Sequence, residues 1–324
     1  VQRLAVAAAT LGAALSAFGQ ASAQTPAAFP QRSITLVVPF APGGSNDMIA
    51  RALAQELTRS LGQSVVVDNK AGAGGTIGAQ FVANAPADGH TLMLASTSLT
   101  VNSAVQPNLP VDAIKSFTPV IQVATSPFVI VAKSSFAPTT PAELVALAKA
   151  KPGVVSYGSS GMGGINHIGT EFFAHAAGVK LNHIPYKGGT PAMNDVLAGH
   201  IDFYMGTLPQ VISQVKAGKV RAIGSTGLQR ARQLPDVPTL AETTPGVSVI
   251  QWWGVFAPAG LPRETLAILN KRINDALVSP EIQKFMETEG AAPAGGTPEQ
   301  FATVIAAEVQ RWSQVVKQAN IKVE

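Results

Sequence analysis

The sequence predicts an α/β protein of two lobes, each with a mostly parallel sheet flanked by helices, and with a ligand cleft between the lobes. Two observations predict this fold. Short apolar runs, typical of buried strands, alternate with stretches in which apolar residues recur at helical spacing. Glycine- and serine-rich turns follow several of these strands. The length of 324 residues is enough for two lobes, because domains usually contain roughly 100–200 residues.

The composition describes a well-buried globular chain. Charged residues make up 13% and hydrophobic residues 46% of the sequence, whereas charged residues usually reach about 25%. The net charge of +4 comes without a long basic run, so nucleic-acid binding has little support. The sequence contains no cysteine, which excludes disulfides, thiol catalysis and cysteine-ligated metals.

Residues 1–23 are predicted to be a secretory signal peptide. Arg3 precedes an apolar run from Leu4 to Phe18, and the small residues Ala21 to Ala23 form a cleavage site. A retained membrane anchor is the alternative, but the run of 15 residues is shorter than the about 20 that a membrane span needs. We therefore expect an exported protein that works in a bacterial periplasm.

The first strand–turn–helix unit is predicted from Ile34 to Arg51, ITLVVPFAPGGSNDMIAR. The apolar run Ile34–Val38 suits a strand, Pro39–Gly44 a turn, and Ser45 a helix N-terminus. A helix that begins this way presents unpaired N–H groups, and these groups and the helix dipole favour an anion. We expect Asp47 to hold the turn so that its amides point into the cleft. The alternative is that the two glycines merely allow a tight turn.

Two further units follow in the first lobe. Val65–Val67 is a predicted strand that leads through the turn Lys70–Gly78 into a helix, and Thr91–Ala95 is a predicted strand that ends at Ser96–Ser98. Three consecutive units favour a parallel sheet, in which ligands bind beyond the carboxyl ends of the strands. Those ends offer amides and hydroxyls but no histidine or carboxylate pair, which suits holding an anion. The glycine spacing in the second turn is one residue off G-x-G-x-x-G, and we expect no cofactor.

The stretch from Thr100 to Pro119 loses periodicity and is predicted to link the two lobes. The second lobe repeats the same unit, and its main turn is Gly158–His167, GSSGMGGINH, before a helix over residues 166–177. A second glycine turn, Pro185–Asp195, precedes another helix. The predicted strands of this lobe cover residues 120–123, 128–132, 154–157, 181–184, 203–205 and 220–224, the last of which crosses back.

The C-terminal third is predicted to complete the first lobe. Trp252 and Trp253 lie in an apolar run, where core packing is more common for a tryptophan pair than lining a cleft. Helices are predicted over residues 262–278, 280–288 and 298–320, each with proline at or near its first turn. The resulting first lobe contains residues 24–100 and 223–324, and the second lobe contains residues 101–222.

Catalytic and metal-binding interpretations have little support. Neither Ser45 nor Ser160 lies in the G-x-S-x-G of serine hydrolases. His167, Glu171 and His175 would share one helix face, but no carboxylate cluster completes a metal site. We expect His167 to serve the helix N-terminus or to pack at the cleft, and His175 to lie on the surface. The sequence therefore predicts no catalytic and no metal-binding residue.

Six segments in a fixed order carry a family resemblance. They read VVPFAPGGSNDMIAR, VVVDNKAGAGGTIGAQFVANAPADGHTLMLA, YGSSGMGGINHIGTEFF, IPYKGGTPAMNDVLAGHIDF, LPDVPTLAE and WWGVFAPAGLP. Together they resemble the tripartite tricarboxylate transporter substrate-binding proteins, the TctC-like receptors of the Bug family, from about Ile34 to the C-terminus. The resemblance implies a periplasmic binding protein of type II that is not an enzyme. It would deliver a small di- or tricarboxylate, acidic amino acid or aromatic acid to a permease of a large and a small subunit. We expect it to act as a monomer.

The family holds carboxylates with main-chain amides, hydroxyls and ordered water, without an arginine clamp. By position, the resemblance implies that this role falls on residues of both lobes: Phe40, Gly43, Gly44, Ser45, Asn46, Asp47, Thr97, Ser159, Ser160, Gly161, Gly163, Lys187 and Thr207. Gly164 stands where many members carry serine, a departure that would change the side-chain contacts to the far end of the ligand. Ser159→Ala is expected to weaken binding modestly, and a bulky residue at Gly44 is expected to abolish it.

The residues leave two alternatives from other classes open. One is a secreted serine hydrolase, which should turn over esters and lose activity with a single serine substitution. The other is a partner of a periplasmic sensor, which should bind the same ligand without depending on a permease.

Overall fold

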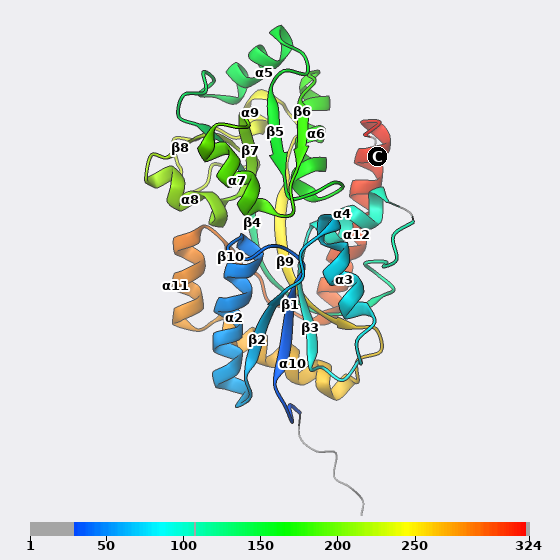
Figure 1. The fold of residues 1–324 in the computed structure, drawn as a ribbon. Helices are drawn as coiled ribbons and strands as arrows, with labels where there is room; N and C mark the ends of the chain where they lie inside the picture. The colour runs from blue at the N-terminus through cyan, green and yellow to red at the C-terminus, as the bar shows by residue number, and fades with distance from the viewer. Residues whose placement is uncertain (1–28, 107, 322–324) are drawn as a thin grey trace, which may run out of the picture.

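The computed structural model describes residues 29–106 and 108–321. It has two lobes, one above the other in Figure 1, and strand β4 (Phe117–Lys133) runs through both of them. Both lobes have a sheet with parallel strands and with helices packed on its faces, which confirms the predicted α/β class. The predicted signal peptide lies outside the described residues, and the predicted lobe boundaries near residues 100 and 222 stay a prediction.

The sheet of the first lobe has the order β2-β1-β3-β9-β4. Its strands are β1 (Ile34–Val38), β2 (Val65–Asn69), β3 (Thr91–Ser96), β9 (Ile250–Pro258) and the first part of β4, with the short β10 (Ala292–Pro293) paired to β4. The first three strands pair in parallel, and β9 is antiparallel to both β3 and β4. The carboxyl ends of β1 and β3 therefore point toward the second lobe.

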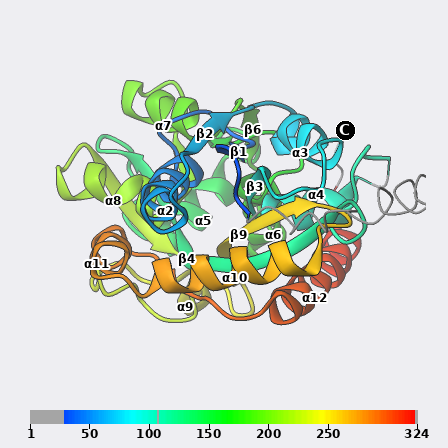
Figure 2. The ribbon, with the colours of Figure 1, turned by 90° about the horizontal axis from the view of Figure 1, so that it is seen from below.

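Helices cover both faces of this sheet, as Figure 2 shows from below. On one face, α2 (Ser45–Leu61), α10 (Arg263–Leu277) and α11 (Pro280–Glu289) bury apolar side chains such as Leu53, Leu269 and Met286. On the other face lie α3 (Thr76–Ala83), which follows the short η2 (Ala73–Gly75), and the start of α12 (Pro298–Gln318). Trp252 and Trp253 are both buried in these cores, so the tryptophan pair serves packing.

The sheet of the second lobe pairs the rest of β4 with β7, β7 with β5 and β5 with β6, and β8 also pairs with β4. Its strands are β5 (Ser156–Ser159), β6 (Asn182–Pro185), β7 (Phe203–Thr207) and β8 (Val220–Ser225). Its helices are α5 (Pro141–Ala150), α6 (Ile165–Ala177), α7 (Gly189–Ala198), α8 (Leu208–Lys216) and α9 (Leu240–Thr243). One core lies under α5, α6 and α9, and another under α7 and α8.

Helix α12 belongs to the packing of both lobes. Phe301 and Ile305, near its start, lie in a core of the first lobe, whereas Trp312, near its end, lies in a core of the second lobe beside Phe172. The C-terminal helix therefore links the two lobes along one side of the molecule, which Figure 1 shows in red.

Several elements differ from the sequence prediction. Helix α7 begins at Gly189, inside the predicted turn, and no helix was predicted over α8 or α9. Residues predicted as the start of a linker form the helix α4 (Ser98–Val105). The two strands predicted on either side of residues 124–127 form the single strand β4, although this segment contains Pro119 and Pro127. Proline lacks a backbone N–H and is tolerated where the ladder is irregular, and the register of β4 against β9 shifts after Pro119.

Candidate functional site

A cavity lies between the two lobes, and small-molecule sites are commonly found in such concave places between two parts of a protein. Residues of both lobes line it: Phe40, Ala41, Gly44, Ser45, Asn46, Ser96, Ser98, Phe128, Ser160, Ile165, Asn166, Gly189, Tyr204, Thr207, Gln210 and Gln251. None of these lining residues carries a charge, and polar side chains are interleaved with aromatic and aliphatic ones. Such a lining suits a small ligand that has both polar and apolar parts.

Five helices begin at the wall of this cavity. They are α2, α4, α6, α7 and α8, and each contributes a residue of its N-cap or first turn to the lining. Within the described residues, none of these five has a side-chain hydrogen bond at its N-cap. Among the helices that begin elsewhere, a Ser or Thr side chain caps α5, α9, α11 and α12, whereas α3 and α10 also have no side-chain cap.

The missing caps matter because a helix N-terminus carries unpaired N–H groups and about half a positive charge. The N–H groups of Ser45, Asn46 and Asp47 have no hydrogen-bond partner in the described part of the chain. A Ser or Thr cap would occupy one such N–H. The cavity therefore collects hydrogen-bond donors and positive potential without any lysine or arginine, and it can hold an anion.

The turns before α2 and α6 have the same construction, GGSND in the first lobe and GGINH in the second. Gly43 and Gly163 both have a left-handed backbone, with φ of +79° and +72°, which favours glycine. The N–H of Gly43 donates to Asp47 Oδ2 at 3.0 Å, as predicted for Asp47. The N–H of Gly163 donates to His167 Nδ1 at 3.2 Å. Each lobe thus fixes its turn through the side chain four residues later.

The protonation states of these two anchors follow from their surroundings. Burial opposes the charge of Asp47, but hydrogen bonds from Arg51 and from the N–H of Gly43 outweigh it and lower the pKa of the carboxyl group. Arg51 also forms an ion pair with Asp47 at 2.9 Å. Burial lowers the pKa of His167 to about 4, so its imidazole is neutral at pH 7 and can accept the hydrogen bond from Gly163.

Two asparagines hold the helix starts in place. The side chain of Asn46 accepts a hydrogen bond from Trp253 Nε1 at 2.8 Å. The side chain of Asn166 donates to the carbonyl of Met205 at 2.6 Å and accepts from Ser160 Oγ at 2.6 Å. These bonds tie each helix start to a strand of its own lobe, so the donors around the cavity are preorganised.

Three polar side chains of the lining have atoms without a partner among the described residues. Thr207 Oγ1, Gln210 Nε2 and Gln251 Oε1 are all buried and make no hydrogen bond. The other end of the Gln210 amide, Oε1, accepts from Tyr204 at 2.9 Å, which turns Nε2 outward as a free donor. Buried polar groups are normally paired, so these atoms indicate where a bound molecule or water makes its contacts.

The two lobes touch each other around the cavity. The N–H of Ile165, at the start of α6, donates to Ser98 Oγ at 3.2 Å. Thr190 Oγ1 donates to the carbonyl of Pro42 at 3.3 Å on the other side. These two contacts hold the lobes together on two sides of the cavity.

Six of the thirteen residues predicted for the site line the cavity: Phe40, Gly44, Ser45, Asn46, Ser160 and Thr207. Gly43 and Asp47 lie next to it and shape the first-lobe turn. Gly163 has the corresponding place in the second lobe. Gly161 and Lys187 line a separate, open depression at the edge of the lobes, together with Met162 and Tyr186. The participation of all thirteen in ligand binding stays a prediction.

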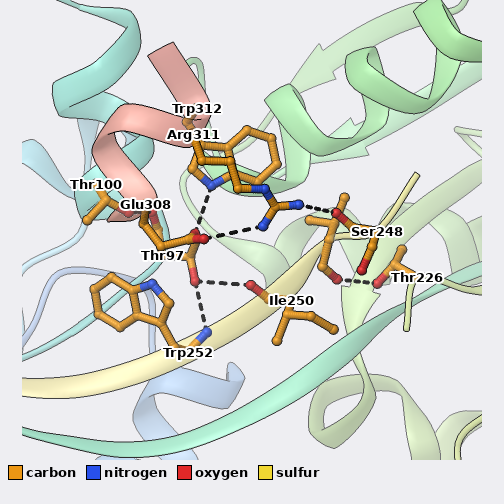
Figure 3. A network of polar contacts seen from close by, with 10 residues as sticks. Thr97, Thr100, Thr226, Ser248, Ile250, Trp252, Glu308, Arg311 and Trp312 are labelled. Carbon is orange, nitrogen blue, oxygen red and sulfur yellow. Dashed lines mark hydrogen bonds and ion pairs between the residues drawn. The ribbon is translucent and has the colours of Figure 1, made fainter. Parts of the chain in front are cut away.

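Thr97 and Ser159 face away from the cavity. Figure 3 shows Thr97 in a network between α4, β9 and α12, where its hydroxyl donates to Ile250 O and accepts from Trp252 N at 2.8 Å. In the same figure Arg311 of α12 donates to Ser248 O just before β9. The hydroxyl of Ser159 pairs with His183 Nε2 at 2.6 Å. Both predicted residues therefore support the walls of the site from behind.

The predicted list misses several lining residues, above all Phe128, Gln210 and Gln251. Phe128 and Gln251 come from the middle of the molecule, where β4 and β9 pass between the lobes, and no motif marks them in the sequence. Ser96 and Ser98 could have been found from the sequence, because both follow the predicted strand Thr91–Ala95, at whose carboxyl end ligands are expected to bind.

The histidines of α6 do not form a metal site. His167 is buried and stacks on His183 with ring centroids 3.9 Å apart, whereas His175 is exposed. Within the described part of the chain, no group of three metal-ligating side chains is close enough to hold an ion. In the same residues, no helix is long and apolar enough to span a membrane.

The chain is similar to known proteins along most of its length. Residues 49–321 match the profile of the tripartite tricarboxylate transporter family receptor. The structure of R. palustris Rpa4515 with adipate has 35% identity and a TM-score of 0.88, over 91% of this chain and 99% of that one. The periplasmic binding protein BugD has the same identity, TM-score and coverage. MatC from Rhodopseudomonas palustris with bound malate has 31% identity and a TM-score of 0.85, over 89% of this chain and 100% of that one.

Proposed function

Because this chain belongs to the tripartite tricarboxylate transporter receptor family, we propose that it is a periplasmic receptor that captures a small dicarboxylate between its lobes and passes it to a membrane permease. The family and its structural neighbours are substrate-binding proteins and not enzymes. The alternative of a secreted serine hydrolase is therefore set aside.

One observation carries the carboxylate part of the proposal. Five helix N-termini without side-chain caps converge on a cavity that has no charged lining residue. A carboxylate at Ser45 and Asn46 would meet free N–H groups and the positive end of α2. A second carboxylate would meet the free donors Thr207 Oγ1 and Gln210 Nε2 at the start of α8.

The apolar part of the lining favours a ligand with a short hydrocarbon middle. Phe40 of the first lobe and Phe128 and Ile165 of the β4 and α6 segments supply aromatic and aliphatic surface to the cavity. Two similar proteins are described with adipate and with malate, which are dicarboxylates of six and four carbons. We therefore propose a ligand of about this length, whose ends contact different lobes.

Capture would act through the balance between open and closed lobes. A ligand shifts this balance only by the difference between its affinities for the two states, and contacts to both α2 and α8 exist together only when the lobes are closed. Delivery to a permease then requires that the partner recognise the closed form. A sensor partner would use the same closed form, so this alternative stays open.

Calorimetric titration of residues 24–324 tests the proposal, after unfolding and refolding to remove co-purified ligand. Adipate and malate are the probes, and their diamides are the matched neutral controls. We expect saturable binding of at least one acid and none of the amides. Stabilisation against heat should reach about 2.7 kcal/mol at a hundredfold excess of ligand over Kd. Absence of binding by a wider panel of mono-, di- and tricarboxylates would contradict the proposal.

Uptake of the same labelled acid by cells distinguishes transport from sensing. A transport receptor requires the permease, so deletion of either the receptor or the permease should stop uptake to the same extent. Uptake that persists without the receptor, combined with loss of a transcriptional response to the acid, would favour the sensor partner.

A further inference from the structure

The amide of Gln251 lies on the floor of the cavity without a partner. Gln251 belongs to β9, is 3% exposed and contributes to the lining. Its Oε1 is buried without a hydrogen bond, and among the described residues its Nε2 also has none. The amide therefore offers both an acceptor and a donor to whatever occupies the cavity.

Gln251 is placed to contact the middle of a bound ligand. The helix N-termini that attract carboxylates lie on the walls, with α2 in the first lobe and α8 in the second. Gln251 lies between them on a strand that passes from one lobe to the other, as does Phe128 of β4. A dicarboxylate that spans the two walls thus places its central carbons, and not its charged ends, over this floor.

From this placement we infer that Gln251 selects dicarboxylates with a hydroxyl group on a central carbon over plain dicarboxylates. This inference rests on the proposed function. A hydroxyl both donates and accepts, and it matches the two free ends of an amide. A methylene chain leaves the buried amide unpaired, which is unfavourable. The hydroxyl must face the floor, so the two enantiomers of a hydroxy acid should bind differently.

Succinate and malate form a matched pair of probes, because they differ by one hydroxyl group. We expect the better enantiomer of malate to bind at least about tenfold more tightly than succinate to the protein of residues 24–324. The variant Gln251→Leu keeps the approximate size of the side chain but removes its polar atoms. In this variant the ratio of malate affinity to succinate affinity should fall to within about threefold, while succinate binds as well as before or better.

Gln214→Leu is the matched control. Gln214 belongs to α8, its Oε1 is also buried without a partner, and it does not line the cavity. This variant should keep the wild-type ratio of malate to succinate affinities. Equal affinity for succinate and both enantiomers of malate in the wild-type protein would overturn the inference, and so would an unchanged ratio in Gln251→Leu. Either result leaves the proposed function standing. Failure of every dicarboxylate to bind overturns both.

Discussion

Asp47 in the first lobe and His167 in the second have the same task. Each side chain accepts a hydrogen bond from the N–H of the glycine four residues before it, at 3.0 Å from Gly43 and at 3.2 Å from Gly163. The two anchors respond differently to acid. Asp47 is charged and held by Arg51, whereas His167 accepts the bond only in its neutral form.

We expect acid to destabilise the second lobe first. Burial lowers the pKa of His167 to about 4, and burial with the neighbouring His167 lowers that of His183 to about 3, from 6.5 for ordinary histidine. The unfolded chain therefore takes up these protons before the folded protein does. Stability is fully present above pH 6.5 and falls as the pH drops toward 4, by about 1–3 kcal/mol for His167.

Denaturant unfolding at a series of pH values measures this loss. His167→Asn keeps an acceptor oxygen but cannot titrate, so its stability should depend less on pH between 6.5 and 4. His175→Asn is the control, because His175 is exposed and should leave the wild-type slope unchanged. Equal slopes in wild type and His167→Asn would contradict the role given to His167.

At Gly44, we expect a small side chain to leave ligand affinity nearly unchanged and a large one to lower it. An added Cβ would lie 3.7 Å from Thr190 Oγ1 and 3.8 Å from Ala41 O, which is ordinary contact, so Gly44→Ala should bind adipate or malate nearly as the wild type does. Gly44→Phe would fill the space between the lobes. Overpacking costs about 1–3 kcal/mol, which corresponds to a roughly 5- to 150-fold loss of affinity. Calorimetry that finds undiminished affinity in Gly44→Phe would rule out this cavity as the site.

Neighbouring serines of the second-lobe turn should have different effects. Ser160 lines the cavity and donates to Asn166, so Ser160→Ala should weaken binding by about 3- to 10-fold. Ser159 faces His183, so Ser159→Ala should weaken binding less and should lower the free energy of unfolding by about 1 kcal/mol. Calorimetric titration with ligand measures the affinities of both variants, and denaturant unfolding measures their stabilities. The reverse order of affinities would mean that Ser159 contacts the ligand directly.

Trp312 should be important for stability although it lies near the C-terminus. Its side chain is fully buried in a core of the second lobe, and its Nε1 donates to Glu308 at 2.9 Å. Trp312→Ala should lower the free energy of unfolding by about 3–5 kcal/mol. Trp312→Phe should cost less, because a ring still fills most of the space. Denaturant titration measures both variants, and a loss below 1 kcal/mol in Trp312→Ala would contradict the packing role of α12.

The sequence is informative where structure is local. The strand, turn and helix from Ile34 onward, and the corresponding unit around Gly158–His167, could be predicted because glycine, helix-start residues and apolar spacing act over a few residues. The helix α4 was missed, because its residues Ser98–Val105 follow the strand β3 without a proline or glycine to mark a boundary. The sequence predicts two strands where β4 is continuous, because that continuity depends on pairing with β9, which is distant in the sequence.

The candidate site could also be predicted only in part from the sequence. The sequence predicts the loops that line the cavity, but which of two neighbouring residues faces the cavity depends on the local backbone and on the packing around it. Ser96 and Ser98 line the cavity while Thr97 contacts β9, and Ser160 lines it while Ser159 contacts His183. Gln251 reaches the cavity only because β9 passes between the lobes, and that is a property of the whole fold.

The uncapped helix starts have a consequence for how the specificity of this receptor can change. Donors that belong to the main chain are present whatever side chain is attached, so point mutations in the lining would leave the proposed anchor for a carboxylate in place. Residues such as Gln210, Gln251 and Phe128 are then free to vary one at a time. Under the proposed function, a new acid would be accommodated without rebuilding the part that recognises charge, and the scaffold would be a practical starting point for engineered carboxylate sensors.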